Sequence, residues 1–300
     1  MCGHRGSPHK APENTIESFE EAMKDGANAL EFDLCLTKDE EIIIWHDWNP
    51  NDISALLRAN GFEPDVKYKP LFPAMFSEFR KTIDEFTLEE SRKYFSYADK
   101  NSDEPSESKI PTLRDFFIWS KDKSNLLYVF LDLKIPAVKA DLVEIFMNKL
   151  EELLNEFKPP YKIVIETEHK EIQKKLRKDY PDYSFSLDIA PPLGFIFLPR
   201  LHSAVKAAIK NGNNFAVAIK PRQITVGSWI THRRIINYDV RRRARFNKKH
   251  PDKKIEYLIG CTINKASEME CLIKLGIGGI QTDYPGLLKQ VAEQMGRRIK

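Results

Sequence analysis

The sequence has no long apolar run, and its first residues show no signal-peptide pattern. Its apolar stretches stay well short of the roughly 18 residues that a membrane-spanning helix needs, so we expect no transmembrane segment. The first residues also lack the order of charged, apolar and small side chains that marks a signal peptide. We expect a cytoplasmic protein, with the trimmed mature form of an exported protein as the alternative.

Cysteine is scarce and shows no paired motif. The 4 cysteines, Cys2, Cys35, Cys261 and Cys271, form no C-x-x-C sequence and none of the spacings typical of zinc sites. Cys35 and Cys261 lie in apolar runs that resemble strands, which indicates buried, reduced thiols. This pattern favours a reducing compartment.

A large excess of charge is also missing, because 47 basic residues stand against 44 acidic ones and the net charge is +3. We therefore expect no strongly anionic partner over the whole surface. The stretch from Arg233 to Lys254 is locally basic. A solvated helix face explains it, and a weak contact with an anionic membrane surface is the alternative. It lacks the interleaved aromatic side chains that bind single-stranded bases, so we expect no nucleic-acid partner.

The sequence does contain an apolar fraction of 42%, enough for a real core, and a regular alternation of strand and helix patterns. After a short strand that ends at His4, strand patterns occupy residues 29–36, 42–46, 126–134, 161–165, 183–187, 215–220, 257–263 and 279–282. Helical spacing occurs at residues 15–24, after Thr112 and at residues 138–157. Because no glycine-rich dinucleotide loop is present, the alternation favours a closed barrel over an open sheet. We predict one α/β domain over residues 1–300, a somewhat irregular (β/α)8 TIM barrel.

Two segments interrupt the alternation. Residues 37–40 are too few for a crossover helix, so the chain there either forms a hairpin or returns along the barrel in extended form. Residues 48–109 are too many for a simple loop, and we expect a small insertion with its own helices on the face that holds the active site. Four apolar residues with near-helical spacing form either the core of this insertion or an apolar mouth to the site: Phe72, Met75, Phe76 and Phe79.

Carboxylates alternate with apolar residues in the strand at residues 29–36. Because side chains alternate across a strand, Glu31 and Asp33 share one face, while Leu30, Phe32 and Leu34 share the other. The apolar face suits the layer between barrel and helices, so the two acids point into the barrel. Two buried like charges need a positive partner, either a divalent cation or a pair of salt bridges.

The strand at residues 126–134 repeats this pattern. Asp132 and Lys134 face one way, and Leu131 and Leu133 face the other. A simple ion pair between Asp132 and Lys134 is one explanation. A metal site with an adjacent bound anion is the other.

Two histidines, His4 and His46, stand at the ends of predicted strands. Catalytic groups of such barrels lie at C-terminal strand ends, and one imidazole can accept a proton while another donates one. Asp47 either orients a ring or serves the turn, and the Arg5 guanidinium suits two-point binding of a phosphate. The remaining histidines lie in loop or helix contexts and are expected at the surface: His9, His169, His202, His232 and His250.

Together these segments resemble the glycerophosphodiester phosphodiesterase family, which shares its barrel with phosphoinositide-specific phospholipases C. Each motif is weak alone, but the ordered set is highly specific. The motifs span residues 3 to 285: Gly3-His4-Arg5-Gly6, Pro12-Glu13-Asn14-Thr15, Glu31-x-Asp33, Thr37-Lys38-Asp39, His46-Asp47, Pro111-Thr112-Leu113, Asp132-x-Lys134 and Thr282-Asp283-Tyr284-Pro285.

The resemblance implies a metal site, a proton-transfer pair and a phosphate-binding pair. The all-oxygen ligand set favours one divalent cation, Mg²⁺ or Ca²⁺, over zinc. An insertion after the second histidine is also known in the family. The matching positions are Glu31, Asp33 and Asp132 for the metal, His4 and His46 for acid/base catalysis, and Arg5 and Lys134 for the phosphate.

The chain departs from the family pattern at three points. Asp132 stands where the family usually has glutamate, which is one methylene longer, so the metal is expected to shift or to bind through water. Trp48-Asn49-Pro50-Asn51 follows His46-Asp47 in place of a leucine and an Arg-Thr pair. Cys261-Thr262-Ile263-Asn264 replaces the common Trp-Thr-Val-Asn. The chemistry is expected to survive these changes, whereas the substrate stays open.

The predicted reaction is metal-dependent hydrolysis of glycerophosphodiesters to sn-glycerol 3-phosphate and an alcohol. Either water or a neighbouring hydroxyl of the substrate attacks the phosphorus. A sphingomyelinase D-like or other lysophospholipid phosphodiesterase is the alternative, because it would use the same groups. A barrel that only binds a phosphate ligand is the non-enzyme alternative, and the two intact histidines argue against it.

Overall fold

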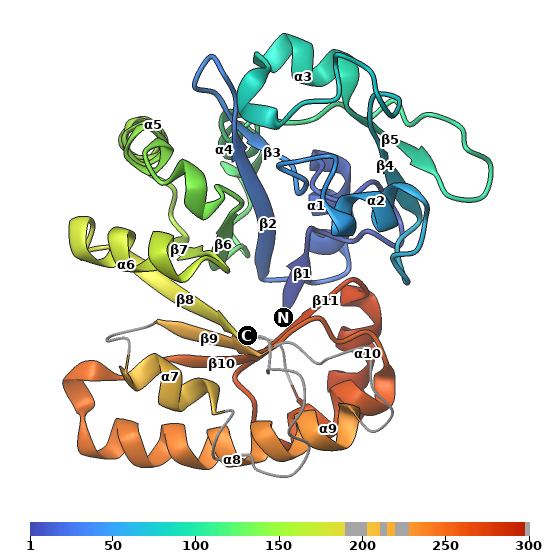
Figure 1. Cartoon of the computed structure of the whole chain (residues 1–300). Helices are drawn as coiled ribbons and strands as arrows, with labels where there is room; N and C mark the ends of the chain where they lie inside the picture. The colour runs from blue at the N-terminus through green and yellow to red at the C-terminus, as the bar shows by residue number, and fades with distance from the viewer. Residues whose placement is uncertain (190–202, 211–214, 220–227, 298–300) are drawn as a thin grey trace.

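The computed structural model describes residues 1–189, 203–210, 215–219 and 228–297. At its centre lies a closed barrel of parallel strands in the order β1–β2–β6–β7–β8–β9–β10–β11, and β11 pairs with β1 to close it. Figure 1 shows helices around these strands, with β1 (dark blue) beside β11 (red). The fold is a TIM barrel, as predicted.

The elements of the barrel follow the predicted alternation. The strands are β1 (Cys2–His4), β2 (Ala29–Leu36), β6 (Tyr128–Leu133), β7 (Lys162–Glu166), β8 (Ser184–Ile189), β9 (Ala216–Ile219), β10 (Tyr257–Gly260) and β11 (Gly279–Thr282). The helices are α1 (Ile16–Lys24), α4 (Leu113–Ser120), α5 (Leu142–Phe157), α6 (Lys170–Asp179), α7 (Ala204–Lys210), α8 (Ser228–Lys249), α9 (Ala266–Leu275) and α10 (Pro285–Gln294).

One predicted helix begins later than expected, and one predicted strand ends outside the described residues. The helix predicted from residue 138 begins only at Leu142, because a separate 3₁₀ turn, η2 (Ala137–Lys139), starts after the extended residue Pro136. Lys220, the last residue of the predicted strand at 215–220, lies outside the described residues.

The outward face of β2 joins the barrel to its helices. Leu30, Phe32 and Leu34 are fully buried. The ring of Phe32 lies 5.1 Å from that of Phe19 on α1 and 4.6 Å from that of Phe116 on α4, measured between centroids. Deleting one such ring typically costs about 3–5 kcal/mol. Since this packing uses only one face of the strand, the other face is left to carry the polar site.

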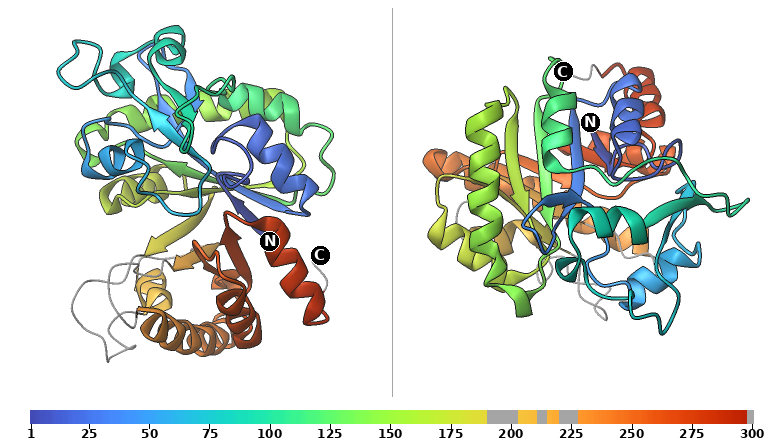
Figure 2. Two further views of the ribbon diagram at one scale, coloured as in Figure 1. Left: turned by 90° about the vertical axis from the view of Figure 1, so that its right-hand side faces the viewer. Right: turned by 90° about the horizontal axis from the view of Figure 1, so that it is seen from above.

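The chain between β2 and α4 leaves the barrel. β3 (Ile42–Ile44) runs antiparallel to β2, so residues 37–40 form a hairpin, one of the two predicted alternatives. The insertion follows, with α2 (Ile53–Ala59), β4 (Tyr68–Leu71), the 3₁₀ helix η1 (Ile83–Glu85), α3 (Leu88–Tyr94) and β5 (Ser96–Asp99). The antiparallel pairing of β4 with β5 was not predicted. Figure 2 shows this segment, light blue to teal, beside the barrel.

The four apolar residues of the insertion are divided between core and surface. Phe72 packs against the main core, and Phe79 stacks on Tyr94 at 4.6 Å between ring centroids. Met75 and Phe76 are exposed, and Phe76 is 99% exposed. The segment is not helical, so its spacing does not bring the four side chains to one face. The first alternative, a core of the insertion, is therefore wrong for Met75 and Phe76.

The cysteines and the basic stretch lie where the composition leads us to expect them. Cys2, Cys35 and Cys261 are buried, and Cys271 is partly exposed. Most basic side chains of residues 233–254 are exposed on α8 and the turn after it, as a solvated face would be. No helix in the described part of the chain has both the length and the apolar character needed to cross a bilayer. The cytoplasmic location and the weak membrane contact stay predictions.

Candidate active site

A cavity of about 530 Å³ lies where several barrel strands end. All residues predicted for the site line it: His4, Arg5, Glu31, Asp33, His46, Asp132 and Lys134. Part of its wall comes from the insertion, including Trp48, Ser54 and Ala55. The structure thus brings the predicted residues together, on the face expected for a TIM-barrel site.

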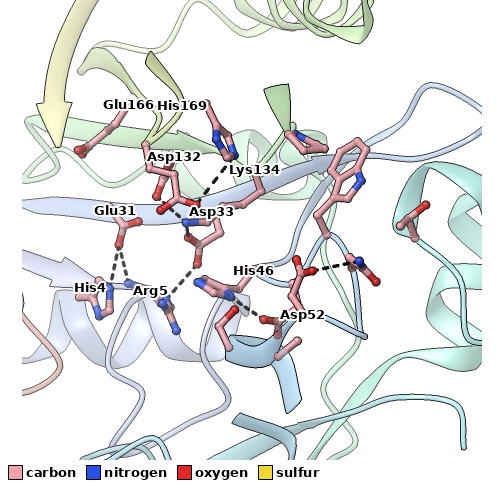
Figure 3. A pocket seen from close by; sticks show the side chains of 18 of the residues that line it. His4, Arg5, Glu31, Asp33, His46, Asp52, Asp132, Lys134, Glu166 and His169 are labelled. Atoms are coloured by element: carbon pink, nitrogen blue, oxygen red, sulfur yellow. Dashed lines mark hydrogen bonds and ion pairs between the residues drawn. The ribbon is translucent and has the colours of Figure 1, made fainter. Parts of the chain in front are cut away.

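Strand register gathers three carboxylates at the floor of this cavity. Asp33 of β2 lies opposite Asp132 of β6, and His4 of β1 lies opposite Glu31. One carboxylate oxygen from each of Glu31, Asp33 and Asp132 lies within 4.8 Å of the others, and all three residues are buried. Figure 3 shows the three side chains in one part of the cavity. We call these residues the acid triad.

The protein's own cations compensate the acid triad incompletely. Nζ of Lys134 lies 3.0 Å from Asp33 and 2.7 Å from Asp132. Burial alone would raise the pKa of Asp33, but Lys134 and Arg5 hold it well below its usual range. Burial and the neighbouring Asp33 raise the pKa of Glu31 to about 7. Oδ1 of Asp132 is buried and has no hydrogen-bond partner among the residues that the structure describes. This all-oxygen set, with one acceptor unused, fits a divalent cation.

The imidazole of His4 is held by the last strand. Its Nδ1 lies 2.7 Å from Oδ1 of Asp283, and Oδ2 of Asp283 accepts a hydrogen bond from Asn264 at 2.6 Å. The opposite nitrogen, Nε2, lies 4.0 Å from Oε2 of Glu31. Burial alone would lower the pKa of His4, but the Asp283 and Glu31 carboxylates raise it overall. Asp283 therefore orients the ring so that Nε2 faces the acid triad.

A tight turn carries His4 and Arg5 into the site. Arg5 has a φ of 51° and Gly6 a φ of 88°, both in the left-handed region. A Cβ on Gly6 would lie 2.4 Å from Oγ of Ser18. That hydroxyl donates to the Arg5 carbonyl and accepts from the Ser7 N–H. Glycine is required here because the turn must bring its backbone directly onto α1.

The imidazole of His46 is held by the residue after it. Its Nδ1 lies 2.8 Å from Oδ1 of Asp47. Of the two predicted roles of Asp47, the structure therefore supports orientation of the ring. Burial and the cations of Arg5 and Arg58 hold the pKa of His46 well below its ordinary value. The ring is therefore neutral at neutral pH, and Nε2 is left as a proton acceptor.

Arg5 is enclosed by acids. Its Nη1 lies 2.7 Å from Glu13 and 3.1 Å from Glu63, and its Nε lies 3.0 Å from Asp33. The residue is only 8% exposed. Arg5 neutralises the carboxylates of the site, and its predicted contact with a phosphate stays a prediction.

Sequence reasoning missed two polar residues that complete the floor. Asn14 donates from Nδ2 to Asp33 at 2.8 Å and accepts the Asp33 N–H at 3.2 Å. Thr15, rather than Asn14, caps α1. Glu166 lies opposite Asp132 in the sheet, is buried and lines the cavity. Its place at the end of a predicted strand is the signal that could have indicated it.

The surface assignment was wrong for two histidines. Nδ1 of His9 lies 2.6 Å from the Asp283 carbonyl oxygen, and the His9 ring packs 4.4 Å from that of Tyr284. His169 lines the cavity just after β7. His250 is exposed, as predicted. His202 and the side chain of His232 lie outside the described part of the structure.

Cleavage of a phosphodiester requires neutralisation of charge at the phosphate and proton transfer at two oxygens, and the cavity provides groups for both. Fold and site thus define the class as a barrel phosphoric diester hydrolase. Residues 4–287 match the Glycerophosphoryl diester phosphodiesterase family, and the chain belongs to that family. The resemblance seen in the motifs is confirmed.

Proteins similar to this chain in sequence and in structure agree with this assignment. The chain is 25% identical to a glycerophosphodiester phosphodiesterase of Caldanaerobacter subterraneus subsp. tengcongensis, over 99% of this chain and 98% of the relative. It is similar to the crystal structure of a glycerophosphodiester phosphodiesterase from Thermotoga maritima, with a TM-score of 0.60, 18% identity and coverage of 97% and 96% of the two chains. An Oleispira antarctica phosphodiesterase, solved with the product sn-glycerol-3-phosphate, has a TM-score of 0.64, 16% identity and the same coverage. Both structures show the common fold.

The departures from the family pattern face the cavity. Asp132 belongs to the acid triad, and Trp48 and Cys261 line the cavity wall. Substitutions at these positions therefore change the shape of the space that a substrate enters, while the acid triad and both imidazoles are retained.

Proposed function

We propose that this protein hydrolyses glycerophosphodiesters to sn-glycerol 3-phosphate and an alcohol, with one divalent cation, Mg²⁺ or Ca²⁺, held by Glu31, Asp33 and Asp132. The observation that carries the proposal is the convergence of the acid triad and both imidazoles on one cavity. Family membership supports the reaction, and the Oleispira relative with its bound product supports the phosphate end of the substrate.

The bound cation would neutralise charge on a non-bridging phosphate oxygen. One of His4 and His46 takes a proton from the attacking oxygen, of water or of a neighbouring substrate hydroxyl, as the new P–O bond forms, and the other gives a proton to the leaving oxygen as its bond breaks. Attack by the substrate hydroxyl gives a cyclic phosphate, which water then opens to sn-glycerol 3-phosphate. Each ring has Nε2 for this task because its Nδ1 is paired with a carboxylate. Lys134, and Arg5 behind it, stabilise negative charge on the phosphate.

Release of sn-glycerol 3-phosphate from glycerophosphocholine, with and without EDTA, tests the proposal. EDTA should abolish turnover, and excess Mg²⁺ or Ca²⁺ should restore it. Glu31→Gln and His46→Ala should each lose on the order of 10²-fold or more in kcat, whereas the exposed His250→Ala should match the parent. Turnover that resists EDTA rejects the cation, and full activity of His46→Ala rejects its proton transfer.

A lysophospholipid is the second candidate substrate, because exposed apolar side chains lie on elements that form the cavity. Val138 lines the cavity and is 88% exposed, and Ile53, on the pocket-lining helix α2, is 78% exposed. Arg80 donates to the Pro50 carbonyl at 2.7 Å, which ties the segment that follows the exposed Phe76 to the segment before α2. Exposed apolar side chains of this kind suit the acyl chain of a micellar substrate.

Two substrates separate the candidates. The double variant Phe76→Ser, Ile53→Ser should lose several-fold in activity on lysophosphatidylcholine micelles and keep its activity on glycerophosphocholine. Ile118→Ser on α4, where Ile118 is 59% exposed, is the matched control. If the double variant loses no micellar activity, or loses both activities equally, the lipid candidate fails.

A further inference from the structure

Helix α2 of the insertion has an inverted polarity. Arg58 is buried at 6% exposure, whereas Ile53 and Leu57 on the same helix are 78% and 51% exposed. Burying a guanidinium while exposing two large apolar side chains is unfavourable unless the charge meets partners inside. A short surface helix with this arrangement therefore indicates that Arg58 is needed where it lies.

The partners of Arg58 are carboxylates of the active site. Its Nη2 binds Glu13, its Nε lies 3.4 Å from Oδ2 of Asp47, and its Nη1 lies 3.4 Å from Glu63. Asp47 is itself buried, and its other oxygen, Oδ1, holds Nδ1 of His46 at 2.8 Å. The Asp47 carboxylate thus lies between the His46 ring and the Arg58 guanidinium.

This guanidinium is a direct charge partner of Asp47. Within the described part of the chain Oδ2 of Asp47 makes no hydrogen bond, and the ion pair with Arg58 compensates the charge on that oxygen. Burial raises the pKa of Asp47 to about 6, and Arg58 opposes this rise. Without Arg58 the carboxyl group would take up a proton or turn away, and it would cease to be a fixed acceptor for the His46 N–H.

Two glutamates tie Arg58 to the turn that carries His4. Glu13 binds Arg58 through one oxygen and Arg5 through the other, and Glu63 lies within ion-pair distance of the same two arginines. Arg5 and His46 line the same cavity, and both are labelled in Figure 3. The arrangement therefore couples the insertion to both ends of the catalytic pair.

We propose that Arg58 is a positioning residue, supplied by the insertion, that holds Asp47 in place and thereby fixes the tautomer and orientation of His46. The inference rests on the proposed proton-transfer role of His46. It gives the insertion a function in turnover itself, separate from any contact with substrate. Because Arg58 is not among the residues that line the cavity, its loss should lower kcat and leave KM nearly unchanged.

Three variants test the proposal on glycerophosphocholine. Arg58→Ala should lower kcat about 10- to 100-fold, as loss of a residue that orients a catalytic group does. Added guanidinium ion at non-denaturing concentration should restore part of that kcat, because it can occupy the space left between Asp47 and Glu13. The kcat of Arg58→Lys should fall between those of the parent and the alanine variant. The lysine ammonium restores the positive charge, but it cannot contact all three carboxylates as the planar guanidinium does.

Arg80→Ala is the matched control. Arg80 also anchors the insertion, through Asn51, Pro73 and Pro50, and none of these contacts reaches His46. Its kcat should stay near that of the parent and should not respond to guanidinium. His46→Ala should be inactive and should also fail to respond.

The outcomes separate the positioning role from the proposed function. Parent-like kcat in Arg58→Ala, with an inactive His46→Ala, overturns the positioning role alone. Equal losses in Arg58→Ala and Arg80→Ala, without rescue by guanidinium, show a merely structural role and also overturn it. Full activity of His46→Ala overturns the proposed function instead. If Arg58→Ala does not fold, Arg58→Lys decides, and an unchanged kcat in that folded variant with the tautomer of His46 unchanged by ¹⁵N NMR overturns the proposal.

Discussion

Oδ1 of Asp283 lies 2.7 Å from Nδ1 of His4, although 279 positions separate the two residues in the chain. Pairing of the last strand, β11, with the first, β1, brings them together. Closure of the barrel therefore completes the site as well as the fold, because the ring on the first strand is oriented from just beyond the last.

Asp283→Asn should inactivate the enzyme while leaving it folded. The amide of Asn264 donates to Oδ2 of Asp283, so an asparagine would turn its oxygen toward Asn264 and its NH₂ toward His4. That NH₂ would donate to Nδ1 of His4 and force the proton onto Nε2. We expect a kcat loss on the order of 10³-fold, with a small change in Tm.

Asp65→Asn is the control for this experiment. Oδ2 of Asp65 accepts from the same Asn264 amide at 3.2 Å, but Asp65 is exposed and does not touch His4. Its kcat should remain within a few-fold of the parent. A parent-like kcat in Asp283→Asn would show that the tautomer of His4 does not matter.

Gly6→Ala should damage both stability and turnover. The new Cβ would lie 2.4 Å from Oγ of Ser18, in a residue whose φ of 88° already disfavours a side chain. Gly276→Ala is the matched control, because Gly276 has a φ of 78° and open space around it. Gly276→Ala should lower the unfolding free energy by about 1 kcal/mol and leave the activity unchanged. A cost in Gly6→Ala no larger than in this control would argue against the tight turn.

The barrel was predictable because its signals are local. β2 occupies the predicted residues, since an eight-residue run of apolar and acidic residues has a strand pattern of its own. β4 and β5 carry no such signal. Each has only four residues, β4 contains Pro70, and the partner of each lies far along the chain. Their pairing depends on tertiary packing of the insertion.

The site was predictable to the extent that it rests on strand alternation. Alternation placed Glu31 and Asp33 inside the barrel, and strand ends indicated His4. Arg58 could not be found in this way, because the spacing of Ile53 and Leu57 indicates that α2 buries the opposite face. Its inward direction depends on acids contributed by other parts of the chain.

His46 should remain neutral in the folded protein below pH about 6.5, the ordinary pKa of imidazole. Burial and the cations of Arg5 and Arg58 disfavour the charged ring. Below pH about 6.5 His46 binds a proton in the unfolded chain but not in the folded protein. His46 therefore lowers the unfolding free energy as pH falls through about 6.5. ¹⁵N NMR titration, with His46→Ala to identify the signal, measures it. A His46 ring that titrates at or above 6.5 would contradict the expectation.

Asp239 should make stability fall as pH rises through the mildly acidic range. It is buried on α8, accepts from the Ser203 hydroxyl and accepts the Ala204 N–H at 2.9 Å. Burial raises the pKa of Asp239 from 3.8 to about 6. Between these values the unfolded chain loses the proton and the folded protein keeps it, which costs at most about 3 kcal/mol.

Asp239→Asn stays neutral, its amide oxygen can accept the Ala204 N–H, and its NH₂ can donate to Oγ of Ser203. Relative to the parent, its unfolding free energy should therefore increase between pH about 4 and pH about 7. Thermal or urea unfolding at the two pH values measures the difference. Parallel pH profiles for the two proteins would show that the parent carries no such penalty.

The most direct test of the account is calorimetric titration of the EDTA-stripped protein with Mg²⁺ and Ca²⁺. We expect one cation to bind the parent, and binding to be lost in both Glu31→Gln and Asp132→Asn. Glu168→Gln should bind like the parent, because Glu168 lines the same cavity but lies outside the acid triad. A parent that binds neither ion, or triad variants that bind as tightly as the parent, would contradict the account.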